Sequence, residues 1–548
     1  MRSAILSAVF ACCSVAAVAR ATQPEAPRPE FPEGTPVPRS LTPQEAAWLK
    51  SHPIQTLRGT PEPPSGPIEC VAEYEPMEGI LMSWEGGVSF TNVLAAMAKW
   101  ITNDAATLVY MVVDNAAEQS AATTSLSSAG ALMTRVKFLI RETDSIWIRD
   151  YGPRYIYEGN CRAIIDHIYN RPRPADDVLP VGFAEYKNHA RYDLDLIHGG
   201  GNYHLDAINR SFCTKLVVNE NPSKTQMQIH DLWQSYQAVD THFFDPFPTS
   251  VDATQHLDMW MQVIADNKVV ISDWPNNVGS TQDVICDQAA LYMAAQGYTV
   301  FRTPARSVGG IHYTYTNVVM CNNIVLVPSY TNPSVTAHNE PARLVWAGAM
   351  PDKTIIQVNG QPIVGSAGVL HCIVMHIPTA RGSGSPTAYL KNLRGGESLM
   401  GGDLVEIRWI SDDDASVTSV DLQLSNNGGA SYPTTIVAGT APDGSYLWTV
   451  PPISTSAARI RAVVYDGESH TGFDQSAANF SITSPLLRGD VNCDGAVNFG
   501  DAPVMALRLI DPTAYGMAYP LCDPAAADVN IDGRVDGDDV DALFNVFP

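Results

Sequence analysis

Basic side chains are scarce in this sequence. It has 34 Lys and Arg against 58 Asp and Glu, a formal net charge of −24 over 548 residues. Nucleic-acid binding needs clustered Lys and Arg to attract phosphate, so the composition argues against a general nucleic-acid binder and favours a cationic ligand. Long apolar runs are missing beyond the N-terminus, which predicts no transmembrane segment in the mature chain. Hydrophobic residues make up 45%, enough for the two to four domains that the length predicts.

The N-terminus carries the longest apolar stretch. Residues 4–18 are mostly apolar, and Ala19-Arg20-Ala21 supplies the small residues of a cleavage site. This pattern predicts a secretory signal peptide over residues 1–21. A lipoprotein signal ending at Cys12 is the alternative. We therefore expect a secreted or cell-surface protein.

Cysteine is also sparse. Ten are present, and eight remain after cleavage of the signal. Their density is too low for a disulfide framework, and none has the C-x-x-C spacing of a zinc site. Cys493 and Cys522 are a candidate pair. If they pair, six remain, and reserving one as a free thiol leaves an odd number for the others.

Composition divides the rest of the chain. Residues 22–67 are rich in Pro, Glu and Thr, which predicts an extended or partly disordered leader with one short helical stretch over 42–50. Between residues 68 and 380, β-rich runs alternate with amphipathic stretches, which predicts an α/β domain. The expected strands are Gly79–Trp84, Thr107–Val113, Val136–Ile140, Lys268–Ser272 and Ile324–Pro328, and the expected helices are Thr91–Ile101 and Asp283–Gln296.

The next part of the chain has no helical pattern. Residues 379–387 have the composition of a linker, and residues 388–484 alternate apolar and polar side chains around an Asn-Asn-Gly-Gly turn. This predicts an all-β sandwich of the immunoglobulin or fibronectin type. The expected strands are Asp403–Trp409, Val420–Ser425, Ser445–Val450 and Arg459–Tyr465.

Residues 486–548 contain an internal repeat. Asp-Val-Asn-Cys-Asp-Gly begins at Asp490, and Asp-Val-Asn-Ile-Asp-Gly begins at Asp528. Oxygen ligands at positions 1, 3, 5, 9 and 12 with Gly at 6 form a calcium loop of the EF-hand kind. The expected Ca²⁺ ligands are Asp490, Asn492, Asp494, Asn498, Asp501, Asp528, Asn530, Asp532, Asp536 and Asp539. The doubled loop with Asp at position 12 resembles a dockerin module, which implies a small helical fold and a cohesin-like or cell-surface partner.

Five segments of the α/β domain carry candidate chemistry. They are Trp147-Ile148-Arg149-Asp150-Tyr151-Gly152-Pro153, Gly199-Gly200-Gly201-Asn202, His256-Leu257-Asp258, Thr316-Asn317 and Gly368-Val369-Leu370-His371-Cys372. A Cys–His pair alone indicates acyl transfer. Two additional carboxylates favour a planar cation instead, because paired carboxylates bind the N–H fork of a guanidinium bidentately.

In this order and spacing, the segments resemble the bacterial peptidylarginine deiminase and agmatine deiminase family. The resemblance covers about residues 70–380 and implies the pentein fold, a five-bladed α/β propeller of ββαβ-type repeats. It implies that Asp150 and Asp258 hold the substrate guanidinium and that Asn317 is a further active-site residue. It also implies that His256 is the acid and base and that Cys372 is the nucleophile.

The resemblance implies a covalent route that needs no metal or organic cofactor. A Cys372 thiolate, stabilised by the substrate cation and a protonated His256, attacks the guanidinium carbon. His256 then protonates the departing ammonia and activates a water, which releases citrulline from a thiouronium. The sequence departs from the family pattern at Ala207 and at Thr254-Gln255. Neither is a matched catalytic position, so these departures put substrate fit in doubt rather than activity.

One segment bears on the substrate. Tyr169-Asn170-Arg171-Pro172-Arg173-Pro174 is similar to a stretch in family members that citrullinate peptides ending in arginine, where two Arg grip the α-carboxylate. Arg171 and Arg173 are therefore candidate substrate-binding residues, as are Trp147 and Asp206. Support of the glycine turn explains His204 and Asp206 equally well. The favoured prediction is a secreted hydrolase that converts peptidyl arginine, preferably C-terminal arginine of peptides or proteins, to citrulline.

Three alternatives stay open. An agmatine or small-guanidine deiminase uses the same chemistry without the carboxylate clamp. A non-catalytic surface binding protein would use the sandwich and the dockerin-like module alone. A thiol protease is the weakest alternative, because the papain signature is missing around Cys372 and His256 precedes the Cys.

Overall fold

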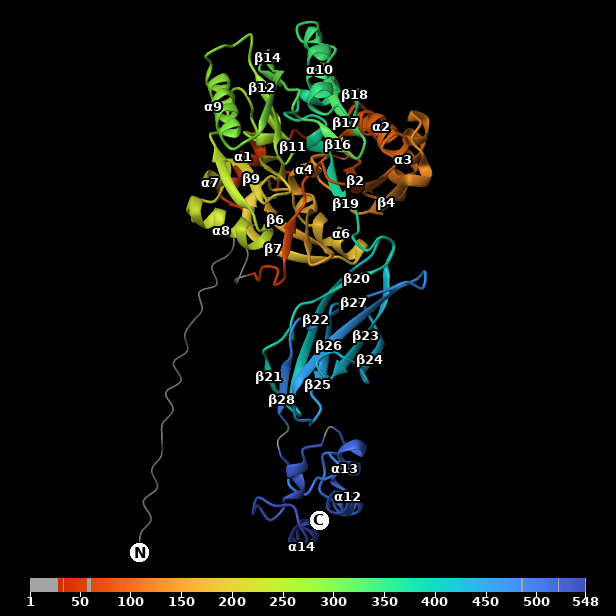
Figure 1. Ribbon diagram of the computed structural model, residues 1–548. Helices are drawn as coiled ribbons and strands as arrows, with labels where there is room; N and C mark the ends of the chain where they lie inside the picture. The colour runs from red at the N-terminus through yellow and green to blue at the C-terminus, as the bar shows by residue number, and fades with distance from the viewer. Residues whose placement is uncertain (1–27, 33, 57–60, 484–485, 521, 548) are drawn as a thin grey trace, which may run out of the picture.

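A computed structural model describes residues 28–32, 34–56, 61–483, 486–520 and 522–547. Figure 1 shows an α/β domain at the top, an all-β domain below it and a small helical module at the C-terminus. The predicted signal peptide lies outside the described residues, as does Cys12. Among the helices that are described, none is both long enough and apolar enough to cross a membrane.

Five small sheets of the α/β domain share one strand pattern. In each, an antiparallel pair continues into a strand that runs parallel to one member of the pair. This confirms the mixed α/β class, and a further two-stranded sheet of β14 (Arg306–Val308) and β15 (Ile311–Tyr313) lies in the same domain. The strands are β19 (Met375–Pro378), β2 (Met77–Ser83), β3 (Leu108–Val113) and β4 (Val136–Ile140); β1 (Ile68–Cys70), β5 (Arg154–Glu158), β6 (Cys161–Tyr169) and β7 (Ala190–His198); β8 (Tyr203–Leu205), β9 (Arg210–Thr214) and β10 (Asp240–Phe244); β11 (Met261–Ala265), β12 (Lys268–Asp273) and β13 (Thr299–Pro304); β16 (Val319–Cys321), β17 (Ile324–Ser329) and β18 (Thr354–Asn359).

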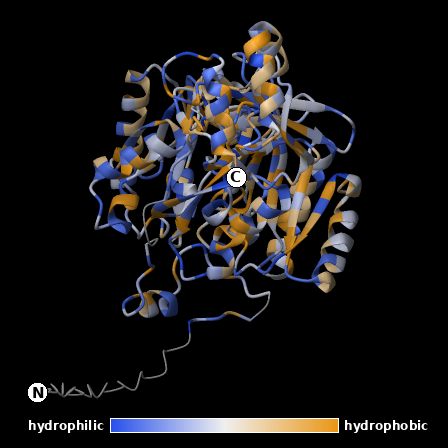
Figure 2. Ribbon diagram, turned by 90° about the horizontal axis from the view of Figure 1, so that it is seen from below, coloured by the Kyte–Doolittle hydropathy of each residue, from blue (hydrophilic) through white to orange (hydrophobic). Residues whose placement is uncertain are grey.

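Each parallel connection passes through at least one helix, the usual crossover between parallel strands. The crossover helices are α2 (Gly87–Asn103), α6 (Leu179–Lys187), α8 (Gln226–Gln237), α9 (Thr281–Ala295) and α10 (Asn339–Ala349), with α3 (Ala116–Ala129) between β3 and β4. Both predicted helices are present as α2 and α9. The observed α2 begins before the predicted start because Phe90, in its first turn, packs into the core at 3% exposure. Figure 2, from below, shows apolar strand segments inside the domain and polar faces on its outer helices.

The first sheet joins the two ends of the domain. β19 pairs antiparallel with β2, with Met375 opposite Leu81. Since β19 begins three positions after Cys372, this pairing anchors the end of the domain that carries the predicted nucleophile.

The leader differs from the prediction of an extended or partly disordered segment. Its helix α1 (Pro43–Leu49) has the predicted location and a capping box, in which Thr42 and Glu45 bond each other's backbone N–H groups. The preceding residues enter the α/β domain, where Arg39 is 0% exposed. The composition correctly indicates that this segment has no core of its own, but the segment finds its partners in the domain that follows.

The all-β domain is built as predicted from two packed sheets around a separate core. One sheet contains β20 (Thr387–Leu390), β22 (Leu404–Asp412) and β25 (Ser445–Thr449); the other contains β21 (Ser398–Met400), β23 (Val417–Ser425), β24 (Thr434–Thr440), β26 (Thr455–Asp466), β27 (Thr471–Gln475) and β28 (Phe480–Thr483). Every strand that the sequence predicts is present. The Arg162 side chain of β6 donates to both carboxylate oxygens of Asp412 and to the Asp413 carbonyl, so a buried ion pair ties this domain to the α/β domain.

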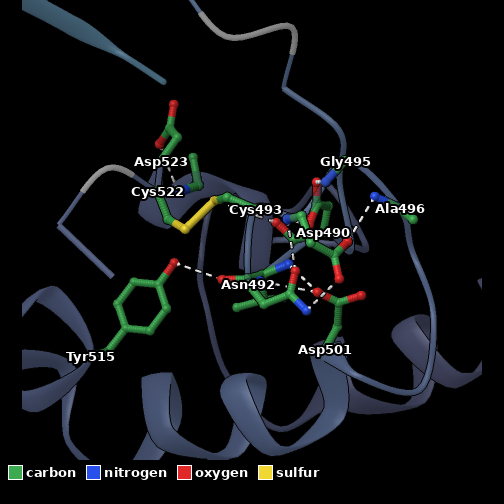
Figure 3. Close-up of a disulfide and its surroundings, with 12 residues drawn as sticks. Asp490, Asn492, Cys493, Gly495, Ala496, Asp501, Tyr515, Cys522 and Asp523 are labelled. Atoms are coloured by element: carbon green, nitrogen blue, oxygen red, sulfur yellow. Dashed lines mark hydrogen bonds between the residues drawn. A yellow bond between two sulfur atoms is a disulfide. The ribbon is translucent and has the colours of Figure 1, made fainter. Parts of the chain in front are cut away.

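The C-terminal module consists of two loops and short helices. The helices are α12 (Asp501–Ile510), α13 (Pro512–Ala518) and α14 (Asp538–Val546), and they pack around Val491, Val504 and Leu543. The candidate disulfide between Cys493 and Cys522 is formed (Figure 3). The six other described cysteines are free and buried.

Candidate active site

All five predicted segments lie at the same place in their sheets. Each directly precedes the strand that opens an antiparallel pair: β5, β8, β11, β16 or β19. Asp150 lies in α4 (Ile148–Tyr151), and Cys372 lies in the short helix His371–Ile373. Because these strands occupy equivalent positions, the segments meet in one place although they are far apart in sequence.

The centre of this place holds a guanidinium from the leader. Arg39 donates from Nε to Asp150 Oδ2 at 2.8 Å and from Nη2 to Asp150 Oδ1 at 2.7 Å. It also donates from Nη1 and Nη2 to the two oxygens of Asp258, both at 3.0 Å. The two carboxylates therefore grip the fork in the bidentate manner that the sequence predicts for a substrate.

The three other predicted catalytic residues border the same group. The Cys372 Sγ atom is 2.7 Å from Arg39 Nη1, and the His256 Nδ1 atom is 2.8 Å from Nη2. Asn317 donates from Nδ2 to Cys372 Sγ at 3.1 Å and accepts the His371 backbone N–H at 3.0 Å. The structure thus brings five predicted residues together, and each is 0% exposed: Asp150, His256, Asp258, Asn317 and Cys372.

Charge balance governs the ionisation of this buried cluster. Burial would raise the pKa of Asp150 and of Asp258, but the Arg39 guanidinium holds both well below their usual range. Burial lowers the pKa of Arg39, but Asp150 and Asp258 raise it, and the net pKa lies well above the ordinary value of an arginine.

Desolvation also acts on Cys372. Burial raises the pKa of its thiol well above the usual range, although Arg39 acts in the opposite direction. Desolvation and the nearby Asp258 and Asp150 therefore oppose the thiolate that the resemblance implies.

The glycine run gives the guanidinium its space. A Cβ on Gly201 would lie 1.9 Å from Arg39 Nη2, and one on Gly199 would lie 2.6 Å from His256 Cε1. The Gly201 backbone N–H also donates to Asp150 Oδ1 at 3.2 Å. Any side chain at these two positions would therefore displace either the cation or the histidine.

A second group of charged residues, which the sequence analysis missed as functional, supports the first. His371 contacts Asp258 Oδ2 through Nδ1 at 3.0 Å and Glu73 Oε2 through Nε2 at 2.8 Å. Arg149 donates to the other Glu73 oxygen at 2.6 Å. Burial would raise the pKa of Glu73, but Arg149, His371 and His376 hold it well below its usual range. Arg149 and His371 lie in two of the five motif segments, whereas no sequence motif marks Glu73.

The predicted carboxylate clamp binds the leader. Arg173 forms a buried ion pair with Glu45 at 2.8 Å, and Arg171 donates from Nε to the Arg39 carbonyl oxygen at 3.1 Å. Trp147, another predicted substrate-binding residue, donates from its indole to the Val37 carbonyl at 2.8 Å. All three predicted residues therefore surround the segment that carries the guanidinium.

Asp206 does not contact this segment. Its carboxylate accepts the backbone N–H groups of Ile208 and Arg210, the Arg210 side chain and the Tyr298 hydroxyl. These partners lie in the turn after β8 and on Tyr298, and they belong neither to the leader nor to the glycine run, the two roles that the sequence left open for Asp206. His204 stacks on His371, with ring centroids 5.3 Å apart.

The two acidic loops of the C-terminal module fold alike. Asp490 accepts the N–H groups of residues 494 and 495, and Asp501 accepts those of residues 491, 492 and 498. Asp528 and Asp539 repeat the same five bonds in the second loop. Figure 3 shows the first loop, with Asp490, Asn492 and Asp501 close to one another.

This arrangement fits a calcium loop in backbone form and in donor type. The glycines at position 6 have the left-handed φ of 87° and 84° that the tight turn requires. In the described part of the chain, three groups of His, Cys, Asp or Glu bring ligand atoms within 4.8 Å of one another, and none lies in these loops. The loop carboxylates bond backbone amides instead.

Residues 69–378 match the family model of the Porphyromonas-type peptidyl-arginine deiminase. The agmatine deiminase of Ectopseudomonas mendocina is 21% identical over 290 residues, covering 44% of this chain and 76% of the relative. That of Pseudomonas putida is 22% identical over 280 residues, covering 43% and 75%. The solved agmatine deiminase of Enterococcus faecalis aligns with a TM-score of 0.50 at 20% identity, covering 57% of this chain and 96% of that one. This likeness shows a pentein-type fold for the α/β domain. The family model ends at residue 378, so the immunoglobulin-like and dockerin-like assignments of the two C-terminal parts stay predictions.

Proposed function

Because the chain belongs to the Porphyromonas-type peptidyl-arginine deiminase family, we propose that it is a guanidine deiminase. Such an enzyme is a hydrolase that replaces one guanidinium nitrogen with oxygen from water and releases ammonia. The position of Arg39 supports the proposal most directly. A guanidinium lies between Asp150 and Asp258, with the thiol of Cys372 and the ring of His256 against its edge.

The proposed mechanism follows from these contacts. The carboxylates orient the guanidinium so that attack by Cys372 becomes nearly unimolecular. As the S–C bond forms, the thiol proton passes through His256 to the nitrogen beside its Nδ1, and that nitrogen leaves as ammonia. Water then adds to the carbon and gives a proton to His256. The C–S bond breaks, the thiol regains that proton, the new hydroxyl passes its own proton to ammonia, and a neutral ureido group remains.

The relatives support small guanidines as the first substrate class. Those reported above are named agmatine deiminases, and agmatine presents the same N–H fork to Asp150 and Asp258. It has no α-carboxylate and so makes no use of Arg171. On these grounds the small-guanidine alternative has more support than the C-terminal arginine that the sequence favoured.

One observation favours peptidyl arginine as a second candidate. Arg39 reaches the site as part of a continuing polypeptide, and its backbone N–H donates to the Ser366 carbonyl at 2.9 Å. Its carbonyl oxygen accepts from Arg171. In a peptide that ended at this position, that oxygen would belong to the terminal carboxylate, and the contact would become charge-assisted.

Ammonia release from four substrates distinguishes these candidates. They are agmatine, free arginine, a peptide with internal arginine and a peptide ending in arginine, each compared by kcat/KM. A small-guanidine deiminase should have a higher kcat/KM for agmatine than for either peptide. A peptidyl-arginine deiminase should have a higher kcat/KM for a peptide than for agmatine. The absence of ammonia from all four substrates, in a folded protein, would refute the deiminase proposal.

We also propose that the C-terminal module binds Ca²⁺ through its two loops and attaches the secreted enzyme to a cohesin-like or cell-surface partner. The repeated hydrogen-bond pattern of Asp490 and Asp528 and the acidic residues at the predicted ligand positions support the calcium site. Calcium titration of the full chain, followed by the near-ultraviolet spectrum, tests it.

A further inference from the structure

The Arg39 guanidinium is completely enclosed. Each of its three nitrogens contacts a carboxylate oxygen, and two of them also contact Cys372 Sγ or His256 Nδ1. Its exposed fraction is 0%. A substrate guanidinium cannot reach Asp150 and Asp258 while this side chain is in place.

Contacts on both sides of Arg39 hold the leader along the site. Before it, the Val37 carbonyl accepts from Trp147. After it, Glu45 is bound by Arg173, and both side chains are 1% exposed. Arg173 also donates to the Pro38 carbonyl at 2.8 Å. These contacts fix the backbone, so the position of the guanidinium depends on more than its own charge.

We propose, on the basis of the deiminase function above, that Arg39 is a modification site of the enzyme itself. Cys372 of the same chain converts Arg39 to citrulline, and the loss of its charge opens the site to other substrates. Covalent connection and the contacts of the leader raise the effective concentration of this guanidinium far above that of a dissolved substrate.

The chemistry balances with water as the only co-reactant. Sγ bonds to the Arg39 guanidinium carbon, and the bond from that carbon to Nη2, the nitrogen beside His256, breaks with release of ammonia. Water then supplies the oxygen and displaces the thiol. The guanidinium cation becomes a neutral ureido group, and the positive charge leaves on ammonium.

The product binds the site less strongly than the reactant. Asp150 and Asp258 are buried beside a cation before the reaction and beside a neutral group after it. Two buried carboxylates without a cation are costly, so they favour exchange of the citrulline for an incoming guanidinium. We expect the leader to bind at least roughly ten-fold more weakly after conversion.

Peptide mapping of the purified full chain tests the modification. In the wild type, residue 39 should carry the mass of citrulline, whereas the Cys372→Ala protein should keep arginine there. Arg28, whose contact with Asp144 is 3.8 Å long and lies outside the site, should stay arginine in both. Unmodified Arg39 in a wild type that releases ammonia from added guanidines would overturn the inference and leave the deiminase proposal intact. Loss of both would instead refute the deiminase proposal.

A mixing experiment tests whether the reaction is intramolecular. Cys372→Ala protein supplies intact Arg39, and active Arg39→Gln protein supplies the thiol. Arg39 should stay arginine in this mixture over the time in which wild-type chains convert completely. Conversion in the mixture at the wild-type rate would overturn the same-chain claim.

Two substitutions at position 39 test its control of access. Arg39→Lys keeps a positive charge that the enzyme cannot remove, and Arg39→Gln is neutral from the start. The Lys variant should be at least ten-fold slower with added substrate than the Gln variant, and the wild type, already converted, should resemble the Gln variant. Arg28→Gln is the matched control and should behave as wild type. Equal rates for the Lys and Gln variants, with equal thermal unfolding midpoints, would overturn the proposed opening.

Discussion

The active site and the C-terminal loops both gather carboxylates, and they satisfy them in different ways. Asp150 and Asp258 are held by a cation that comes from 111 and 219 residues away. Asp490 and Asp528 are held by backbone N–H groups four and five residues away. The first solution places a buried cation between the carboxylates, whereas the second relies mainly on backbone hydrogen bonds, with Arg488 beside Asp528 at 3.0 Å as an additional cation.

This difference predicts where an added cation acts. The candidate active site is shaped around the Arg39 guanidinium, so the cation that enters it must present the same N–H fork. The loops contain more carboxylates than Arg488 can balance, and Asp494 and Asp532 are exposed, so a divalent ion can reach these carboxylates from solvent. The following predictions test this contrast.

Loss of the nucleophile should have the largest effect. Cys372→Ala should reduce ammonia release by roughly 10⁴-fold or more, as removal of a covalent nucleophile does elsewhere. The free energy of unfolding should change by only about 1 kcal/mol, because the substitution removes one buried atom. Activity assays and thermal unfolding of the same preparation measure both. Residual turnover near the wild-type value would exclude Cys372 as the nucleophile.

Removal of either carboxylate charge should have the next largest effect. Asp150→Asn and Asp258→Asn should each lower kcat/KM by about 10²- to 10³-fold, because breaking a buried ion pair costs roughly 3–5 kcal/mol. Asp206→Asn is the matched control. It should lower stability and leave kcat/KM within about three-fold, since its partners are Arg210 and Tyr298. A comparable kcat/KM loss in the control would restore Asp206 as a substrate ligand.

Calcium should affect the loops and leave the active site unchanged. At about one hundred times its dissociation constant, Ca²⁺ should stabilise the C-terminal module by about 2.7 kcal/mol. Chelation should therefore increase protease cleavage beyond residue 486 without changing ammonia release. The Asp501→Asn, Asp539→Asn double variant should behave as chelated wild type. Inactivation of the enzyme by chelator would contradict the separation of the two acidic sites.

The smallest predicted effect concerns the arginine pair. Arg171→Ala and Arg173→Ala together should lower the preference for a peptide ending in arginine over its amide by ten- to a hundred-fold, since each charge-assisted contact contributes about 1.5–3 kcal/mol. The ratio is best measured in an Arg39→Gln background, where the leader competes less. Equal treatment of acid and amide by the unsubstituted pair would show that Arg171 does not read a carboxylate.

Local patterns predicted much of the structure. Alternation and turn residues predicted four strands of the all-β domain and five strands of the α/β domain, and the short helical stretch predicted over 42–50 is present as α1. The motif segments also predicted the five residues that meet at the guanidinium. These residues converge because each motif segment precedes the equivalent strand of its own sheet, so every repeat contains one recognisable motif.

Other features left no such signal. Glu73 joins the site through His371 and Arg149, which lie 298 and 76 residues away. The raised pKa of the Cys372 thiol also has no signal in the sequence, because its largest cause is desolvation by residues from distant segments.

The sequence by itself indicated the residues that meet at the buried guanidinium, because thiol, imidazole and carboxylate groups stand in short motif segments whose order resembles that of the family. It also determined the acidic loops, whose hydrogen bonds close within twelve residues. Only the tertiary structure decided that Arg39 fills the active site. The composition of the leader predicts an extended or partly disordered segment. The partners of Arg39 lie between 111 and 333 residues further along the chain, at Asp150, Asp258 and Cys372. A buried ion pair across such distances depends on the geometry of the whole domain, which no local pattern encodes.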